Sequence, residues 1–218
     1  MRWVQCAAAL CLGVLLASCR FIPTAQVKSM GDTSLMNGAA SFDPDKMVAS
    51  MWAEKVIPYF EKKAGPFAAV RDLAAKAPDD AGAKYGYRAK SDGTPWTLMV
   101  RIEGTIAAAN TESRAAAISV DASGQGKPDA TVQIGPAMRG TAIRDALDFV
   151  SFNDFTNQID FARFGKSFNT YINHATLEKL PRDDLIGRKV TLIGAYALDT
   201  TGEPPLVTPV EIAIGPKP

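Results

Sequence analysis

The sequence contains little of the chemistry from which metal sites and nucleophilic active sites are built. Its 218 residues include one histidine, His174, and three cysteines, all of them before residue 20. A histidine cluster for zinc or copper is therefore excluded, and a Ser-His-Asp triad would have to use His174. A single histidine late in a helical run is more often a surface or packing residue. We expect no metal, no cofactor and no catalytic residue.

The chain also lacks an excess of charge of either sign. It has 24 Lys and Arg against 23 Asp and Glu, which gives a formal net charge of +1 with His neutral. Nucleic-acid-binding proteins usually carry a basic patch and a high pI. We therefore expect no nucleic-acid partner.

The first 18 residues have the pattern of an export signal. Arg2 precedes a mostly apolar run, Val4–Leu16, which closes on the small residues Ala17 and Ser18. This run is too short to cross a membrane as a stable helix. Cys19 follows directly, and the string LASC resembles the lipobox of bacterial lipoproteins, in which the peptide is cut before the cysteine and the cysteine is acylated. The alternative is an ordinary secretory signal followed by an incidental cysteine.

We predict a lipoprotein signal peptide at residues 1–18 and lipidation (a diacylglycerol and an acyl chain such as palmitate) at Cys19. Cleavage would remove Cys6 and Cys11 and leave 200 residues without a free thiol or a disulfide. A chain of this length can bury one sizeable core without covalent help. The expected location is the bacterial cell envelope, anchored to the inner or outer membrane and facing the periplasm. The sequence makes no prediction of the oligomeric state.

Two regions precede the first predicted strand. Residues 19–41 are small and polar without apolar periodicity, which is typical of a tether. Residues 42–80 form a predicted helical arm. Asp43 and Pro44 give an N-cap followed by proline at the first helical position, and apolar residues then recur at helical spacing. Pro58 is expected to end or kink this helix, and a second helix is expected from Pro66 to Pro78.

Residues 81–218 alternate between apolar and polar side chains in five segments. Strands are predicted near residues 96–106, 116–120, 132–134, 190–198 and 206–214, with a helical insert at 141–180 between the third and the fourth. Gly104 is expected to mark a bend or bulge in the long first strand. This order resembles the OB-fold, a five-stranded Greek-key barrel. The predicted fold class is α+β, and the alternative is an α+β sandwich with another strand order.

The densest motif is the stretch from Gln133 to Ala162, QIGPAMRGTAIRDALDFVSFNDFTNQIDFA. Its first part predicts a helix from Thr141 on which Arg144 and Asp148, four residues apart, pair on the outer side. Asn153 or Asp154 is expected to cap a second helix, with Phe155 on its apolar stripe.

This motif, together with FDPDKMVASMW upstream and GRKVTLIGAY downstream, resembles an uncharacterised family of predicted periplasmic lipoproteins, a domain of unknown function. Members of that family tend to be encoded beside sugar ABC importers. The resemblance therefore implies a place in the envelope, with the membrane and importer components as partners. It implies no activity, cofactor or catalytic residue.

Two interpretations of the motif remain open. In one, its polar side chains lock helices against the barrel, because a buried amide or charge without partners costs about 1–3 kcal/mol. In the other, polar groups and aromatic rings line a sugar pocket. The structural interpretation is favoured. The candidate residues are Gln133, Arg139, Arg144, Asp145, Phe152, Phe155, Asn157 and Gln158.

The sequence favours a lipid-anchored accessory or binding protein without catalytic activity. One alternative is a small-molecule or glycoside hydrolase that uses two of the acids near Arg144, namely Asp145, Asp148, Asp154 and Asp160. Another is a purely structural envelope protein. A pocket with two inward carboxylates would favour the hydrolase, and an aromatic pocket without them would favour binding.

Overall fold

The computed structural model describes residues 42–90, 93–199 and 201–217. The predicted signal peptide, the predicted tether and Cys19 lie outside these ranges. Within them, no helix combines the length and the hydrophobicity needed to cross a membrane.

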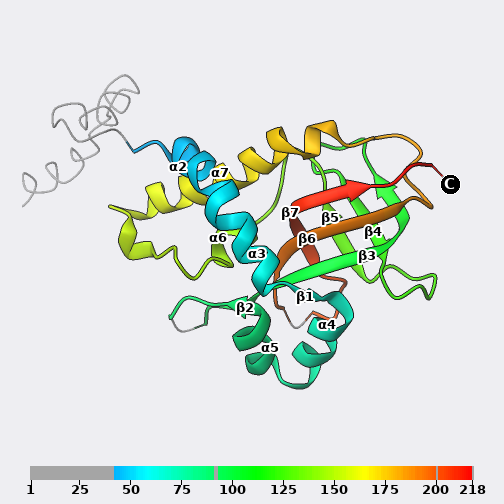
Figure 1. Cartoon of the computed structure of the whole chain (residues 1–218), viewed down its shortest axis with the longest axis horizontal. Coiled ribbons are helices and arrows are strands. Elements are labelled where there is room, and N and C mark those ends of the chain that lie inside the picture. The colour runs from blue at the N-terminus through cyan, green and yellow to red at the C-terminus, as the bar shows by residue number, and fades with distance from the viewer. Residues whose placement is uncertain (1–41, 91–92, 200, 218) are drawn as a thin grey trace, which may run out of the picture. The chain divides into compact units, whose positions relative to one another are not determined.

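Five strands form a closed barrel (Figure 1). Strand β3 pairs antiparallel with β4, and β4 pairs antiparallel with β5. Strand β7 lies parallel to β5 and antiparallel to β6, and β6 returns to β3 to close the ring. The predicted α+β class with an OB-like barrel is confirmed. The strands are β3 (Thr97–Asn110), β4 (Ala117–Asp121), β5 (Ala130–Gln133), β6 (Lys189–Ala197) and β7 (Leu206–Ile214).

Strand β3 is long because it serves two neighbours in turn. Its first part pairs with β6 and its last part pairs with β4. The register shift lies between Ile106 and Ala108, so the bulge follows Gly104 rather than coinciding with it. Gly104 is required for another reason, since a Cβ atom there would lie 2.6 Å from the carbonyl oxygen of Asp121. The glycine allows the two strands to approach closely.

The arm begins as predicted and continues further than predicted. Helix α2 (Pro44–Met51) is capped by the side chain of Asp43, which accepts the backbone N–H of Lys46. Helix α2 passes into a π-helical turn, η2 (Trp52–Val56), and then into α3 (Ile57–Lys63). Pro58 therefore does not end the helix. The π turn ends with the N–H of Ile57 bonded to the carbonyl of Trp52, directly before the proline.

Two further helices and two very short strands complete the first half of the chain. Helix α4 (Phe67–Lys76) occupies the position predicted for the second helix. Helix α5 (Pro78–Tyr85) was not predicted, and it crosses the expected boundary at residue 80. Strands β1 (Gly65–Pro66) and β2 (Gly86–Tyr87) both pair with β3.

The insert between β5 and β6 is divided into more and shorter helices than the sequence predicts. It contains the single turn α6 (Ala142–Asp145), the 3₁₀ helices η3 (Phe152–Asp154) and η4 (Leu177–Lys179), and the long helix α7 (Gln158–Ala175). Neither Asn153 nor Asp154 caps α7. Asn157 does so, because its side chain accepts the N–H of Asp160.

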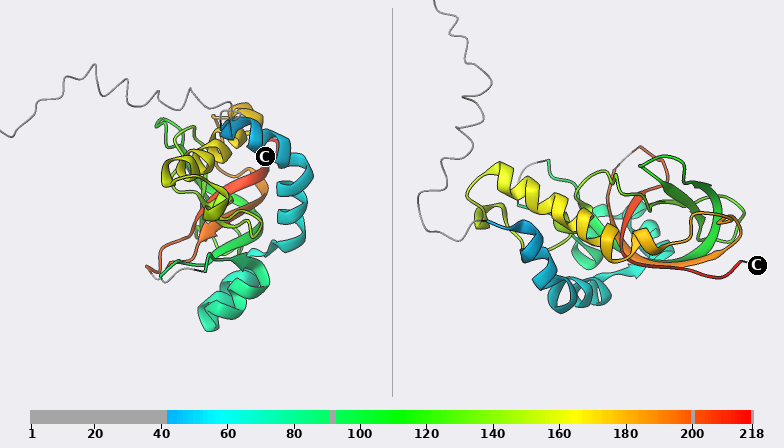
Figure 2. Two further views of the ribbon diagram at one scale, coloured as in Figure 1. Left: turned by 90° about the vertical axis from the view of Figure 1, so that its left-hand side faces the viewer. Right: turned by 90° about the horizontal axis from the view of Figure 1, so that it is seen from above.

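The barrel wall formed by β3 and β6 is covered on both faces. One core fills the barrel with side chains such as Val100, Ile118 and Val132. A second core joins the outer face of the wall, including Met99 and Ala195, to the arm and the insert. Figure 2 shows α2, α3 and α7 on this outer side. The arm and the insert are therefore joined through one apolar layer.

Candidate functional site

Arg144 is the most highly connected polar side chain of the motif. Its Nε and Nη2 donate to Asp145 Oδ1 at 2.8 and 2.6 Å, and Nη2 also donates to Thr141 Oγ1. Its Nη1 donates to the carbonyl oxygen of Phe161 at 3.0 Å. Only 11% of the side chain is exposed. The guanidinium therefore bonds α6 to α7.

The predicted pair of Arg144 with Asp148 is wrong. Helix α6 ends at Asp145 after one turn, so a position four residues beyond Arg144 is no longer on the same helix. The partner is Asp145, the next residue, whose other oxygen accepts the hydroxyl of Thr141 at 2.6 Å. Arg144 also lies between helices rather than on the outer side.

Gln133 holds the loop that follows β5. Its Nε2 donates to Thr208 Oγ1 and to the carbonyl oxygen of Arg139, at 2.9 and 3.1 Å. Its Oε1 accepts the backbone N–H of Arg139 at 2.7 Å. The side chain of Gln133 is 5% exposed, whereas Arg139 is exposed and contributes its backbone. This amide therefore connects the loop to strand β7.

The remaining candidate residues lie around the start of α7. Asn157 is the N-cap described above, and Gln158 is the exposed first residue of the helix. The ring of Phe155 packs against Phe161 and Phe164 at centroid distances of 5.2 and 5.0 Å. Phe152 is 47% exposed, and its ring meets Phe161 edge-on at 5.5 Å.

Three of the four acids near Arg144 have structural partners among the described residues. Asp145 is held by Arg144 and Thr141, and Asp154 accepts the N–H of Ser151 in a capping box. Asp160 accepts the side-chain amide of Asn157 at 2.9 Å. The fourth acid, Asp148, acts on Tyr59. Burial of Tyr59 is the main cause that raises the pKa of this tyrosine, and the negative charge of Asp148 raises it further.

A cavity of about 720 Å³ lies between this insert and the segment that leads into β3. Arg144, Asp145 and Phe152 line it, and the other five sequence candidates do not. Two further rings, Tyr87 and Phe161, contribute to its walls. Asp145 is the only carboxylate among the described lining residues. The remaining lining residues are Ala89, Lys90, Thr94, Pro95, Thr97, Val150, Ser151, Asn153 and Ala197.

Sequence reasoning missed the opposite wall of this cavity. Tyr87, Lys90 and Thr97 belong to a segment that lies 36 to 46 residues before Gln133, the first residue of the motif. Two residues of strand, Gly86–Tyr87, position that wall by pairing with β3. Phe152 and Phe161 both belong to the motif, but nothing in the sequence pattern connected them with Tyr87, the ring on the opposite wall of the cavity.

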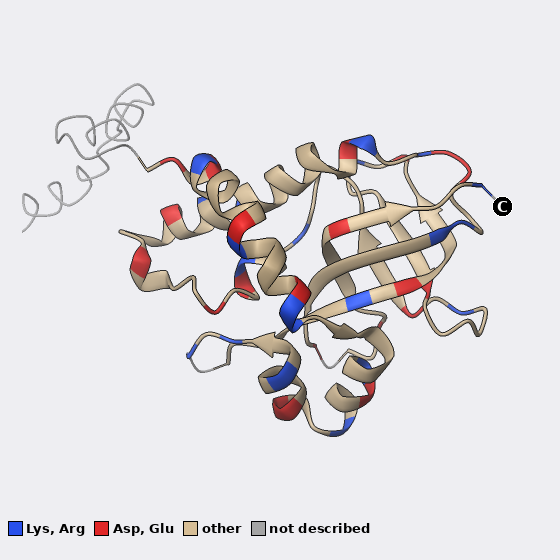
Figure 3. Cartoon of the chain, in the orientation of Figure 1, with Lys and Arg blue, Asp and Glu red and all other residues tan. Residues whose placement is uncertain are grey.

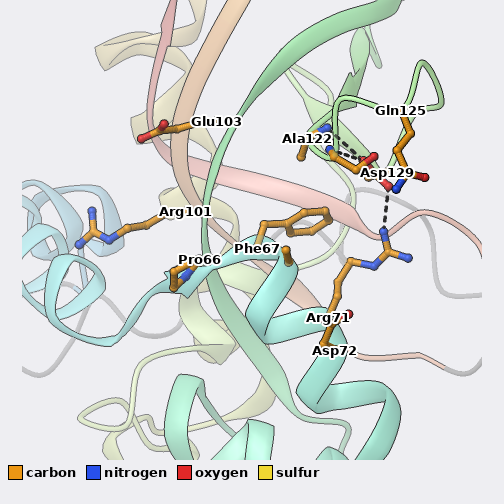
Figure 4. Close-up of a pocket in the computed structure, with 11 residues that line it drawn as sticks. Pro66, Phe67, Arg71, Asp72, Arg101, Glu103, Ala122, Gln125 and Asp129 are labelled. Carbon is orange, nitrogen blue, oxygen red and sulfur yellow. Dashed lines mark hydrogen bonds and ion pairs between the residues drawn. The ribbon is translucent and has the colours of Figure 1, made fainter.

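A second cavity, of about 620 Å³, lies between α4, β3 and the loop after β4 (Figure 4). Arg71 bonds Asp129 at 3.2 Å, and Asp129 also accepts the N–H groups of Ala122 and Ser123. Figure 4 shows Arg101 and Glu103 on one side of β3 and the Arg71–Asp129 pair beyond the Phe67 ring. None of these residues was a sequence candidate.

The single histidine is placed as expected for a surface residue. His174 is 66% exposed, and its Nδ1 lies 2.8 Å from a carboxylate oxygen of Glu178. Within the described ranges, no group of three or more His, Cys, Asp or Glu could hold a metal ion.

The chain belongs to a family described as predicted periplasmic lipoproteins, a domain of unknown function, whose model matches residues 9–213. The resemblance found in the sequence is therefore confirmed. The crystal structure of an OB-fold protein from Thermotoga maritima superposes with a TM-score of 0.62 at 18% identity, covering 81% of this chain and 100% of that chain. This similarity establishes the fold. No curated protein matches the chain.

Proposed function

We propose that this protein is a lipid-anchored accessory protein of the periplasm that binds a small hydroxylated molecule without converting it, in the service of a sugar importer. The observation that carries the proposal is the cavity between Tyr87 and Phe152. Its volume lies within the range of about 300–1,000 Å³ that is usual for small-molecule sites.

The chemistry of the cavity suits a sugar. Tyr87 and Phe152 offer apolar surface against which a sugar ring can pack, and Ser151, Asn153 and Lys90 offer hydrogen-bonding groups nearby. Asp145, the one carboxylate among the described residues that line it, is already bonded to Arg144 and Thr141. A separated pair of acids, which glycoside hydrolysis requires, is not found among the described residues of this wall. Binding without catalysis is therefore the function that this geometry supports best.

Binding can be tested by ligand-dependent stability. The mature protein would be titrated with single monosaccharides, disaccharides and polyols while its thermal unfolding is followed. At about 100 times its dissociation constant, a ligand adds about 2.7 kcal/mol to the apparent stability. We expect a shift with at least one of these compounds and its loss in Phe152→Ala, because that ring lines the cavity.

The matched control is Phe149→Ala. Phe149 is 40% exposed and lies three residues earlier, but it does not line the cavity. It should leave the ligand-induced shift unchanged. The absence of a shift with every compound, or equal loss in both variants, would contradict a sugar site in this cavity.

Anchoring is tested separately. Acyl chains at Cys19 would bury CH₂ groups worth about 0.8 kcal/mol each and hold the domain on a membrane. Cys19→Ala should leave the chain uncleaved or released from the membrane fraction. A Cys19→Ala protein that is still processed and still requires detergent for extraction would disprove lipidation.

A further inference from the structure

Exposed large apolar side chains gather at one end of the described part of the chain. Of the seven that the described residues contain, five lie in two short segments, 42–47 and 149–159. Such side chains scattered singly over a surface need no explanation, but a group of them marks an interaction surface. The five are Phe42, Met47, Phe149, Phe152 and Ile159, and we call them the apolar end.

The two segments are adjacent in space. The ring of Phe42 packs edge-on against Phe155 at 5.8 Å, directly before α7 begins. The ring of Phe149 meets Tyr59 at 5.4 Å and thereby contacts the arm. Figures 1 and 2 show the starts of α2 and α7 at the same end. The apolar end is therefore one region built from both segments.

The chain itself indicates what covers this region. Phe42, the first described residue, is a member of the apolar end, and residues 20–41 separate it from Cys19. A lipid on Cys19 would therefore tether the domain to a bilayer through the segment that enters at this end. Large apolar side chains such as phenylalanine enter the headgroup and acyl boundary of a membrane.

We propose that the apolar end rests on the surface of the bilayer and inserts Phe149 and Ile159 into its interface. This inference rests on the proposed lipid anchor. It orients the domain with α7 leading away from the membrane and places the Phe152 cavity close to the bilayer, where a membrane-embedded importer could reach it.

The charges around the apolar end specify the kind of membrane. Lys46 pairs with Asp43, and Arg163 lies 3.9 Å from Asp160. The exposed acids Asp45, Asp148 and Asp154 have no basic partner among the described residues, and Figure 3 shows acidic positions along this end. Anionic headgroups repel such a surface within about one Debye length, roughly 10 Å at 0.1 M salt. A zwitterionic bilayer is the surface that fits.

The test uses a matched pair of isoleucines. Ile159 and Ile186 are each 65% exposed. Ile159 is the second residue of α7, whereas Ile186 lies in the loop before β6 and lines a hollow together with Ala109 and Thr111 at the end of β3. Helix α7, at whose start Ile159 lies, has 18 residues and is about 27 Å long, and Ile186 comes 11 residues after its last residue, Ala175. Ile159→Cys and Ile186→Cys would each carry an environment-sensitive fluorophore on the lipidated mature protein, in which Cys19 is blocked by its acyl chains. The proteins would be reconstituted into phosphatidylcholine vesicles, with and without a nitroxide-labelled lipid as quencher.

We expect blue-shifted emission and quenching for the label at position 159 but neither for the label at position 186. Partial replacement of phosphatidylcholine by phosphatidylglycerol should reduce the effect at low salt, and added salt should restore it. Phe149→Ser should weaken the quenching of the label at position 159 while the protein still floats with the vesicles.

Three outcomes would overturn the proposal. If the protein floats with the vesicles but the two labels behave alike, the anchor stands and the membrane contact is wrong. If the protein does not float, both the anchor and the orientation are wrong. If the label at position 159 responds only after an envelope protein is added, the apolar end binds a protein rather than lipid.

Discussion

The guanidinium of Arg144 lies over the ring of Phe161, with its Cζ atom 3.8 Å from the ring centroid. The same guanidinium donates to the carbonyl oxygen of Phe161, so one residue of α7 offers it both a ring face and an acceptor. A planar guanidinium can stack on the ring and still direct several N–H groups at acceptors, whereas a compact ammonium group has neither the plane nor the fork of donors. Arg144 thereby orients the start of α7 and the Phe152 wall of the cavity.

Arg144→Lys should therefore be destabilising although it retains the charge. A lysine cannot stack on the Phe161 ring, and its single nitrogen cannot replace the several guanidinium N–H groups that bond Asp145 and Thr141. We expect the free energy of unfolding to fall by about 2–3 kcal/mol, measured by chemical denaturation. Arg163→Lys is the control, since Arg163 is 67% exposed, and it should change stability by less than about 0.5 kcal/mol. Equal effects of the two substitutions would contradict the role assigned to Arg144.

Gly165→Ala should destabilise the protein, although alanine has a higher helix propensity than glycine. A Cβ atom at position 165 would lie 2.7 Å from Thr141 Cγ2 and 2.8 Å from Arg144 Nη1. In an open helix position alanine is better than glycine by about 1 kcal/mol. We expect this gain to be reversed into a net loss of about 1–3 kcal/mol. Ala162→Gly, at an exposed position of the same helix, measures the difference in helix propensity between alanine and glycine without the contact. If Gly165→Ala stabilises the protein, α6 can move away from the new Cβ atom and the predicted clash is wrong.

Gly104→Ala should be strongly destabilising because of contact rather than strand bending. The new Cβ atom would meet the carbonyl oxygen of Asp121 and the side chain of Val120, at 2.6 and 2.7 Å. Moving a backbone strand is costly, and we expect a loss of about 2–4 kcal/mol in thermal or chemical unfolding. Ala108→Val, at an exposed position of the same strand, should stay within about 0.5 kcal/mol. A mild Gly104→Ala would mean that β4 shifts without difficulty.

Gln133 and Thr208 should be energetically coupled. The bond between them is 2.9 Å long and both residues are buried. Gln133→Ala leaves the groups of Arg139 and Thr208 without their partner and should cost about 2–3 kcal/mol. In a double-mutant cycle with Thr208→Val, we expect a coupling energy between about 0.5 and 3 kcal/mol. Additive effects would indicate that Gln133 acts on the loop alone.

Stability should also fall in strong alkali because of Tyr196. Burial raises the pKa of Tyr196 to about 12 from its usual 10.0. Below pH 10 both folded and unfolded chains keep this proton, so the contribution is fully present. Between pH 10 and about 12 the unfolded chain loses it first, and stability falls as the pH rises. Tyr196→Phe should show a shallower decline in unfolding free energy over this window. Identical slopes would mean that Tyr196 titrates normally.

The sequence predicted the barrel well because alternation is a local signal. In β3 the side chains of Leu98, Val100 and Ile102 are buried in the barrel, as their spacing requires. The two-residue strands β1 and β2 were not predicted, because two residues display no period. Helix α5 was missed since Pro78, taken as the end of one helix, is also the first residue of the next.

The candidate site was predicted less completely. The motif did contain the buried side chain of Gln133 and the partly buried side chain of Arg144, but their partners depend on tertiary structure. Thr208 is 75 residues from Gln133, and no local pattern connects them. The early end of α6 also changed the partner of Arg144 from Asp148 to Asp145. Whether the motif only locks the fold or also binds a ligand stays a prediction, which the thermal-shift experiment addresses.

Strand β7 has a consequence for the order of events during synthesis. It is the last strand among the described residues, Leu206–Ile214, and it lies between β5 and β6 in the ring. A nascent chain therefore cannot close its barrel before β7, which ends at Ile214, has been made. Pairings between residues far apart in sequence form slowly. A polypeptide whose barrel stays open until β7 is made can still be threaded through a narrow export channel, which suits a family described as periplasmic.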